Sequence, residues 1–206
     1  MNQETLKGKK IGFGITASFC TVLEVLAPLQ QLRDLGVDIY PVVSDHVNRY
    51  GSRFHNRDVF MGQVADICGR DVITTIAGAE AFGPETPMDL MIVAPATGNT
   101  IAKLASGISD GPVTLAAKAT LRNEQPLLLA LFSNDALGAN GVNVMKLCNT
   151  KHVYFVPFGQ DNPVKKPKSM TADLSLLVDA AVAALAGKQV QPMVVGAVRL
   201  TMGASG

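Results

Sequence analysis

The segment DLMIVAPATGNTIAKLASGISD, residues 89–110, decides the fold class. Its first six residues form a nearly continuous apolar run, as in a β-strand that is buried on both faces. Thr97, Asn99 and Thr100 follow at once and precede a helical pattern, so they are predicted to begin a helix with polar side chains. A buried strand that leads directly into a capped helix is the repeating unit of α/β proteins with a parallel sheet.

Four further apolar runs flank this segment in the sequence: Lys10–Ile15, Val37–Val43, Pro126–Phe132 and His152–Val156. The stretches between them fit helices, which is the spacing of βαβ units. Because the runs do not alternate with polar residues, both faces of their sheet should be covered. We therefore predict a three-layer α/β/α sandwich around a parallel sheet, with the weaker run Val72–Ile76 as a candidate edge strand.

Three stretches carry signals of helices. In Thr21–Leu35 the apolar residues follow a helical period, Pro28 should kink or split the helix, and Gly36 stands where a helix commonly ends. Asp110-Gly111-Pro112 should open a second helix, because Pro suits the first helical position. Met170–Ala186 is predicted to be a final amphipathic helix that closes the sheet.

Two stretches fit no regular element, and both are candidate lids over a cleft. They are Ala77–Pro87, which has two Gly and two Pro, and Pro157–Ser169, which has three Pro and three Lys. The length of 206 residues fits one domain, which we expect to span residues 1–200. Residues 201–206 offer nothing to bury and are expected to be a disordered tail.

The composition excludes several classes of protein. With 17% charged residues and a formal net charge of +1, the chain lacks the overall basic character that drives nucleic-acid binding. Its longest apolar run, LLLALF at residues 127–132, is too short to cross a membrane, and the polar start of the chain predicts a cytoplasmic protein. Three scattered Cys and three dispersed His give no disulfide framework and no metal site.

Small hydroxyl residues follow the first two predicted strands, where ligands of parallel sheets bind. Gly14 permits close approach of a ligand to the backbone, and it is followed by Thr16, Ala17 and Ser18 just before a predicted helix start. The free N–H groups and positive dipole end of the helix, together with the two hydroxyls, suit a phosphate. The alternative is that the hydroxyls only cap the helix. Residues 12–17 also match the dinucleotide pattern G-x-G-x-x-A, but Ser44 stands at the second strand's end where that pattern expects an acidic residue.

The loop after the fourth predicted strand offers Ser133, Asn134 and Asp135, which could hydrogen-bond a ligand or could cap the following segment. Two groups of basic residues could bind a dicarboxylate or an acidic partner, although such groups are commonly solvated surface. They are Lys165, Lys166 and Lys168 on the second candidate lid and Arg49, Arg53 and Arg57 after the second strand.

The run Ala94–Lys103, followed by Gly107–Asp110, resembles the signature of the flavoprotein family of homo-oligomeric flavin-containing cysteine decarboxylases. The resemblance extends from about Lys9 to the final helix. It implies a Rossmann-like, flavodoxin-type sheet, FMN at a subunit interface, and assembly through trimers or larger shells. Carried to the matching positions, the family's FMN-binding residues fall on Thr16, Ala17, Ser18, Ser44, Pro95, Ala96, Thr97 and Asn99.

The chain departs from the family at its catalytic positions. Family decarboxylases carry a catalytic His before the third strand and a P-x-M-N segment after the fourth, where this chain has GPETPM at residues 83–88 and FSNDA at 132–136. His46, His55 and His152 stand elsewhere and are read as surface or structural residues. Without an imidazole for proton transfer the decarboxylase activity is not carried over, and no catalytic residue is assigned.

Within the family, segments 13–20 and 156–167 of this chain are similar to one subunit of a two-subunit oxidoreductase of spore-forming bacteria. This resemblance implies oxidation of dihydrodipicolinate to dipicolinate during sporulation, in the cytoplasm of the mother cell. It also implies a small dicarboxylate substrate and a partner subunit that supplies NADP. A flavin-dependent decarboxylase, a prenyltransferase-like enzyme and a scaffold that has lost flavin remain as alternatives, and the sequence leaves open whether FMN is bound or redox-active.

Overall fold

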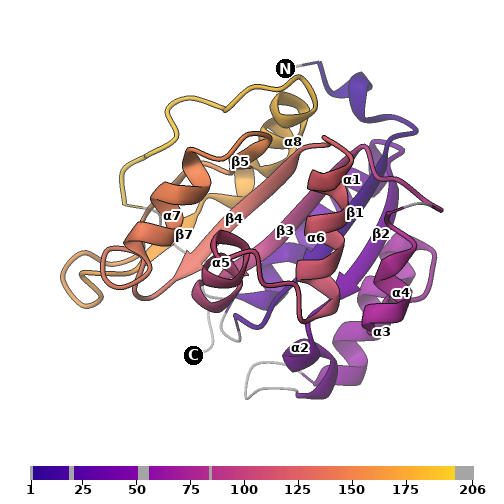
Figure 1. Ribbon diagram of the computed structural model, residues 1–206, viewed down its shortest axis with the longest axis horizontal. Coiled ribbons are helices and arrows are strands. Elements are labelled where there is room, and N and C mark those ends of the chain that lie inside the picture. Colours follow the sequence, from indigo (N-terminus) through magenta and orange to yellow (C-terminus); the bar gives the residue numbers. More distant parts are fainter. Residues whose placement is uncertain (1, 19–20, 51–55, 84, 198–206) are drawn as a thin grey trace.

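A mixed sheet of seven strands runs through the computed structural model, which describes residues 2–18, 21–50, 56–83 and 85–197 (Figure 1). The strand order is β2-β1-β3-β4-β7-β6, and β5 pairs with the first half of β4. The strands are β1 (Lys10–Ile15), β2 (Asp38–Val43), β3 (Leu90–Thr97), β4 (Leu127–Ser133), β5 (Val153–Phe155), β6 (Phe158–Gln160) and β7 (Met170–Ala172).

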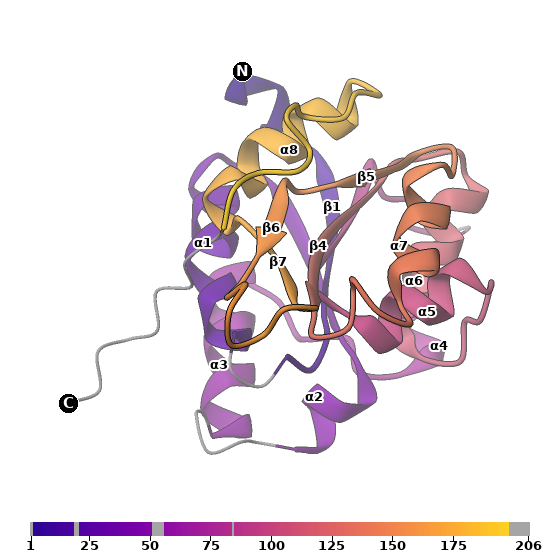
Figure 2. The same ribbon diagram turned by 90° about the vertical axis from the view of Figure 1, so that its left-hand side faces the viewer.

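Helices cover both faces of the sheet, so the predicted three-layer sandwich of the flavodoxin type is confirmed (Figure 2). One face carries α1 (Leu26–Asp34), α3 (Arg57–Cys68) and α8 (Leu177–Leu185). The other carries α4 (Ile76–Glu80), α5 (Gly98–Ala105), α6 (Pro112–Arg122) and α7 (Gly141–Cys148), while the short α2 (Asp45–Arg49) follows β2. Single 3₁₀ turns occur at η1 (Gln3–Leu6), η2 (Val22–Val25) and η3 (Leu174–Leu176).

The five strands β1 to β5 are parallel, as the continuous apolar runs predicted. Every residue of β4 is buried, and β3 is buried up to its last residue. Gly14 in β1 allows α6 to approach closely, because a Cβ there would lie 2.8 Å from side-chain atoms of Met91 and Val113. The start of α6 is thereby fixed beside the carboxyl end of β1.

The antiparallel hairpin β6–β7 corrects two predictions. Phe158–Gln160 is a strand within the segment read as a lid, and Met170–Ala172 is a strand where a helix was predicted to begin. β5 covers only residues 127–129 of β4, so the later backbone groups of β4 need another partner, and Phe132 and Ser133 pair with Thr171 and Met170. Tertiary pairing therefore overrides the helical pattern of this segment.

Two smaller differences lie near the first candidate lid. The run Val72–Ile76 forms no strand and only an isolated bridge between Val42 and Ile73. The stretch Ala77–Pro87 is not irregular throughout, because its first residues belong to α4, which Thr75 caps by accepting from the N–H of Gly78.

The helix predicted over Thr21–Leu35 is split, as Pro28 suggested. The 3₁₀ turn η2 comes first and α1 begins at Leu26, so that Pro28 lies in the first turn of α1, where its missing N–H costs nothing. Gly36 has a φ of 78° and ends the helix as predicted.

Candidate functional site

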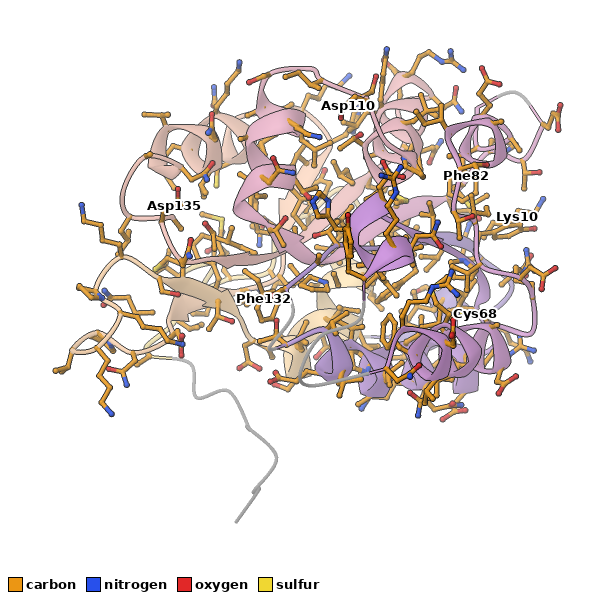
Figure 3. The ribbon with its side chains drawn as sticks, turned by 90° about the horizontal axis from the view of Figure 1, so that it is seen from below. Lys10, Cys68, Phe82, Asp110, Phe132 and Asp135 are labelled. Carbon is orange, nitrogen blue, oxygen red and sulfur yellow. The ribbon has the colours of Figure 1, made fainter. Side chains whose placement is uncertain are left out.

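The loops after β1, β2, β3 and β4 meet at the carboxyl end of the sheet, where they enclose two adjoining cavities. In Figure 1 the arrowheads of β2 and β4 point toward the lower part of the picture, and Figure 3 views the molecule from that side. The first cavity has a volume of about 450 Å³ and the second about 540 Å³, and both are lined by Ala17, Thr97 and Asn99. Each volume lies within the range of small-molecule sites.

The first cavity lies between the end of β1 and the starts of α2, α5 and α6. Its further lining residues are Thr16, Ser44, Asp45, His46, Thr100, Lys103, Asp110, Gly111, Pro112, Val113 and Thr114. The starts of α5 and α6 both face it, and the first backbone N–H groups of a helix, with the positive end of its dipole, favour an anion. The arrangement of helix starts therefore suits a phosphate group.

Thr16 holds the walls of this cavity together. Its side chain is only 2% exposed, and its hydroxyl donates to the carbonyl of Pro95 at 2.6 Å and accepts from the N–H of Thr97 at 3.1 Å. The proton of this hydroxyl is therefore used within the protein. Thr16 ties the loop after β1 to the loop after β3, which is a different role from the phosphate donor that the sequence suggested.

Ser44 has a hydroxyl that is available for a ligand. Its Oγ is buried and has no hydrogen-bond partner among the described residues, although Ser44 stands at the N-terminal cap position of α2. An unpaired buried hydroxyl lowers the stability of a folded protein by on the order of 1–3 kcal/mol. A hydrogen-bond partner from outside the chain would remove this loss. A ligand oxygen in the first cavity would supply that partner.

Charged groups border the first cavity at Lys103 and Asp110. The Nζ of Lys103 lies 2.8 and 3.0 Å from the two carboxylate oxygens of Asp110, and this hydrogen bond lowers the pKa of Asp110 below its usual range. His46 also lines the cavity, from the start of α2. His46 is exposed, in agreement with its interpretation as a surface residue, and its place two residues after Ser44 also brings it to the cavity wall.

The second cavity lies between the loops after β1 and β4 and the β6–β7 hairpin. Its further lining residues are Ser18, Thr21, Gly98, Phe132, Ser133, Asn134, Asp135, Asn140, Asp161, Lys166, Ser169, Met170 and Thr171. In Figure 3 Asp135, on this cavity, and Asp110, on the first, lie well apart on the same side of the molecule.

Asp135 is the centre of a hydrogen-bond network in the second cavity. Its carboxylate accepts from Ser133 Oγ at 2.6 Å and from Asn140 Nδ2 at 3.0 and 3.1 Å. The hydrogen bond from Ser133, followed by that from Asn140, holds the pKa of Asp135 below its usual range, so this carboxylate is ionised at neutral pH. Gly98 makes room for the network, because a Cβ there would lie 2.8 Å from both Ser133 Oγ and Asn140 Nδ2.

The structure brings most of the predicted site residues together. The first cavity is lined by Thr16, Ala17, Ser44, Thr97 and Asn99, and the second by Ser18, Ser133 and Asn134. The hydroxyl of Ser18 accepts a hydrogen bond from the hydroxyl of Thr21 at 2.6 Å. The other three predicted residues, Gly14, Pro95 and Ala96, are buried behind these walls.

Several lining residues were missed. The hairpin contributes Ser169, Met170 and Thr171 to the second cavity. The sequence predicts a lid up to Ser169 and a helix from Met170, and therefore no hairpin. Of the basic residues proposed to bind a dicarboxylate, Lys166 lines the second cavity. The guanidinium group of Arg57 instead donates hydrogen bonds to the backbone and side-chain oxygens of Asn48. Arg53, His55, Cys20 and the predicted tail lie outside the described residues.

The described part of the chain shows neither a membrane-spanning helix nor a metal site. None of its helices has the length and the apolar character of a membrane span. The same residues contain no group of three or more His, Cys, Asp or Glu side chains that could hold a metal ion.

Known proteins are similar to almost the whole chain. The B subunit of dipicolinate synthase from Bacillus subtilis (strain 168) is 44% identical over 191 residues, which cover 93% of this chain and 96% of the relative. The crystal structure of the same subunit of dipicolinate synthase from Bacillus halodurans C superposes with a TM-score of 0.87 at 41% identity, covering 94% of this chain and 99% of that chain.

A more distant structure shares the fold alone. The FMN-dependent cysteine decarboxylase SpaF superposes with a TM-score of 0.62 at 20% identity, over 87% of this chain and 98% of that chain. The family model described as Flavoprotein matches residues 1–186. The chain therefore belongs to the Flavoprotein family.

Proposed function

We propose that the chain binds FMN in the first cavity and along the wall that the two cavities share. The residues present fit this cofactor: Ser44 offers a buried hydroxyl without a partner among the described residues, and two helix starts face the same space. Asn99 and Thr97 lie on the shared wall, within reach of a ligand in either cavity. The convergence of Ser44, Ala17 and the start of α5 on one cavity is the observation that carries the proposal.

The proposed activity is that of the B subunit of a dipicolinate synthase, the oxidation of dihydrodipicolinate to dipicolinate. This reaction removes one hydride and one proton from the dihydropyridine ring and leaves an aromatic pyridine. FMN supplies a hydride acceptor when it is bound. The A subunit of dipicolinate synthase would supply NADP as the final hydride acceptor, and this chain would hold the substrate.

In this scheme the residues of the chain bind and orient. Thr16 fixes the loops after β1 and β3 relative to each other, and the ionised Asp135 keeps Ser133 and Asn140 in place beside the shared wall. Aromatisation of the ring makes the oxidation favourable, and positioning of the substrate next to its hydride acceptor lowers the barrier to the transfer. The protein would work in the mother cell of a spore-forming bacterium as a trimer-based homo-oligomer.

Reconstitution with the A subunit tests this function. The purified chain, loaded with FMN, is mixed with the A subunit, NADP and dihydrodipicolinate, and the formation of dipicolinate is followed by its absorbance. We expect full rate only when both subunits are present. Full rate from the A subunit alone would contradict the catalytic role, and a chain that shows no flavin absorption bands after FMN is added and the unbound FMN is removed would favour a scaffold.

A further inference from the structure

The second cavity contains a buried hydroxyl that the protein itself leaves unused. Thr171 lines this cavity and is only 2% exposed, and its Oγ1 has no hydrogen-bond partner among the described residues. The residue is held firmly, since it pairs with Phe132 of β4 on one side and with Gly159 of β6 on the other. A fixed hydroxyl that lacks a partner is costly in the free protein and is a ready donor for a ligand.

Lys166 brings a positive charge to the same cavity. It lies on the loop between β6 and β7, and its Nζ is 2.6 Å from Oδ2 of Asp161. The side chain of Lys166 remains 57% exposed, whereas that of Asp161 is 14% exposed. An ammonium group has three donors, so a ligand carboxylate can share Lys166 with Asp161.

The rest of the wall is rich in hydrogen-bond donors. Asp161 is paired with Lys166, whereas Asp135 keeps its negative charge but has its oxygens occupied by three hydrogen bonds from neutral side chains. Phe132, Met170 and Ala17 supply apolar surface for a ring. Further hydroxyl and amide groups come from Ser18, Thr21, Ser133, Ser169, Asn99, Asn134 and Asn140.

We infer that the second cavity binds a small ring dicarboxylate, with one of its carboxylates held by Thr171 Oγ1 and Lys166 Nζ. The identity of this ligand as dihydrodipicolinate and its product rests on the proposed function. Because Ala17, Thr97 and Asn99 line both cavities, a ring bound here borders any ligand in the first cavity. Thr171 and Lys166 then decide which substrates enter.

Titration calorimetry with dipicolinate as the probe tests this assignment on the FMN-loaded protein. We expect Lys166→Met to weaken dipicolinate binding by about 10- to 100-fold, because it removes a charge-assisted hydrogen bond. Thr171→Val should weaken binding by about tenfold. Lys165→Met is the matched control, since Lys165 is an exposed neighbour that does not line the cavity, and it should bind as the wild type does.

Thermal unfolding of the ligand-free variants separates binding from a structural role. Thr171→Val replaces an unpaired hydroxyl by a methyl group of similar volume, so its Tm should stay unchanged or rise by about 2–4 °C. A residue that mattered only for the fold would lower the Tm and leave dipicolinate affinity intact, and that result would overturn the inference.

The outcomes also separate this inference from the proposed function. If the wild type with FMN does not bind dipicolinate, or if Thr171→Val and Lys166→Met bind it as tightly as the wild type, the inference is wrong even where FMN binds normally. If FMN does not bind but dipicolinate binds with the expected order of variants, the flavin proposal fails and the carboxylate site stands.

Discussion

At the scale of single residues, the hydroxyls of Thr16, Ser44 and Thr171, which all line the two cavities, have different roles. Thr16 is satisfied by Pro95 and Thr97, whereas the hydroxyls of Ser44 and Thr171 are buried without partners among the described residues. Satisfied hydroxyls stabilise the fold, and unsatisfied ones reduce stability unless a ligand completes them. The two kinds should therefore respond to mutation with opposite signs.

Thr16→Val should lower the free energy of unfolding by about 1–3 kcal/mol, because it leaves the carbonyl of Pro95 and the N–H of Thr97 buried and unpaired. Ser44→Ala is the matched comparison and should leave the free energy of unfolding unchanged or raise it, since α2 receives no hydrogen bond from this side chain. Urea denaturation of the apo-protein measures both. Equal losses in the two variants would refute the assignment of roles.

Asp135 should make the stability of the protein depend on pH in acid. The pKa of Asp135 is lower in the folded state, so the carboxylate stabilises the fold above its unfolded pKa of about 3.9, and this contribution is lost as the pH falls through the lower folded value. Asp135→Asn should therefore be less stable than the wild type at pH 7, by on the order of 0.5–1 kcal/mol after screening by solvent.

Acid titrations of thermal stability measure this difference between the wild type and Asp135→Asn. The gap between the two proteins should be constant from pH 7 to about pH 5 and should close below about pH 4. A gap that persists unchanged at pH 3 would show that the carboxylate charge is not what Ser133 and Asn140 stabilise.

The location of a single residue could be predicted from sequence where it follows directly from strand and helix ends. Thr97 and Asn99 had to lie at the carboxyl edge of the sheet, because a buried strand ends just before them. The partner of a side chain cannot be read in this way. That the carbonyl of Pro95 takes the proton of Thr16 depends on how two loops, 79 residues apart in the chain, cross each other.

At the scale of elements, the start of α5 is packed so closely against the loop after β4 that no side chain fits between them. Gly98 is its first residue, and a Cβ there would meet Ser133 Oγ and Asn140 Nδ2 at 2.8 Å and Asp135 Oδ1 at 3.0 Å. The absence of a side chain thus lets α5 and the Asp135 network share one wall of the second cavity.

Gly98→Ala should lower the free energy of unfolding by about 1–3 kcal/mol, because the added methyl group forces the Asp135 network apart. Gly62→Ala in α3 is the control: nothing lies within 4 Å of its Cβ position, so this variant should gain about 0.5–1 kcal/mol from helix propensity. Chemical denaturation compares the pair. A Gly98→Ala protein as stable as Gly62→Ala would contradict the close packing described here.

The elements with the strongest sequence signals were the most predictable. The five parallel strands were predicted because short, continuous apolar runs between helical segments are typical of strands buried on both faces. The strands β6 and β7 have three residues each, too short to show a period, and the β7 segment also continues into an apolar helical pattern. Its strand form depends on the free edge that β4 leaves beyond β5, which sequence periodicity does not reveal.

At the scale of the whole molecule, the order of the strands explains why the site lies where it does. Parallel strands β2, β1, β3 and β4 stand side by side, so the loops that follow them meet at one edge (Figure 1). The antiparallel hairpin then adds a further wall beyond β4 and creates the second cavity. The fold thus provides two adjoining cavities, for which we propose a phosphate in the first and a carboxylate in the second.

Flavin binding in the first cavity can be measured by titrating FMN into the apo-protein and following flavin fluorescence. We predict saturable binding with one FMN per chain for the wild type, and an affinity about tenfold lower for Ser44→Ala, which removes one hydrogen bond to the ligand. Wild-type protein that leaves the fluorescence of FMN unchanged, or a Ser44→Ala variant that binds FMN as tightly as the wild type, would contradict the account.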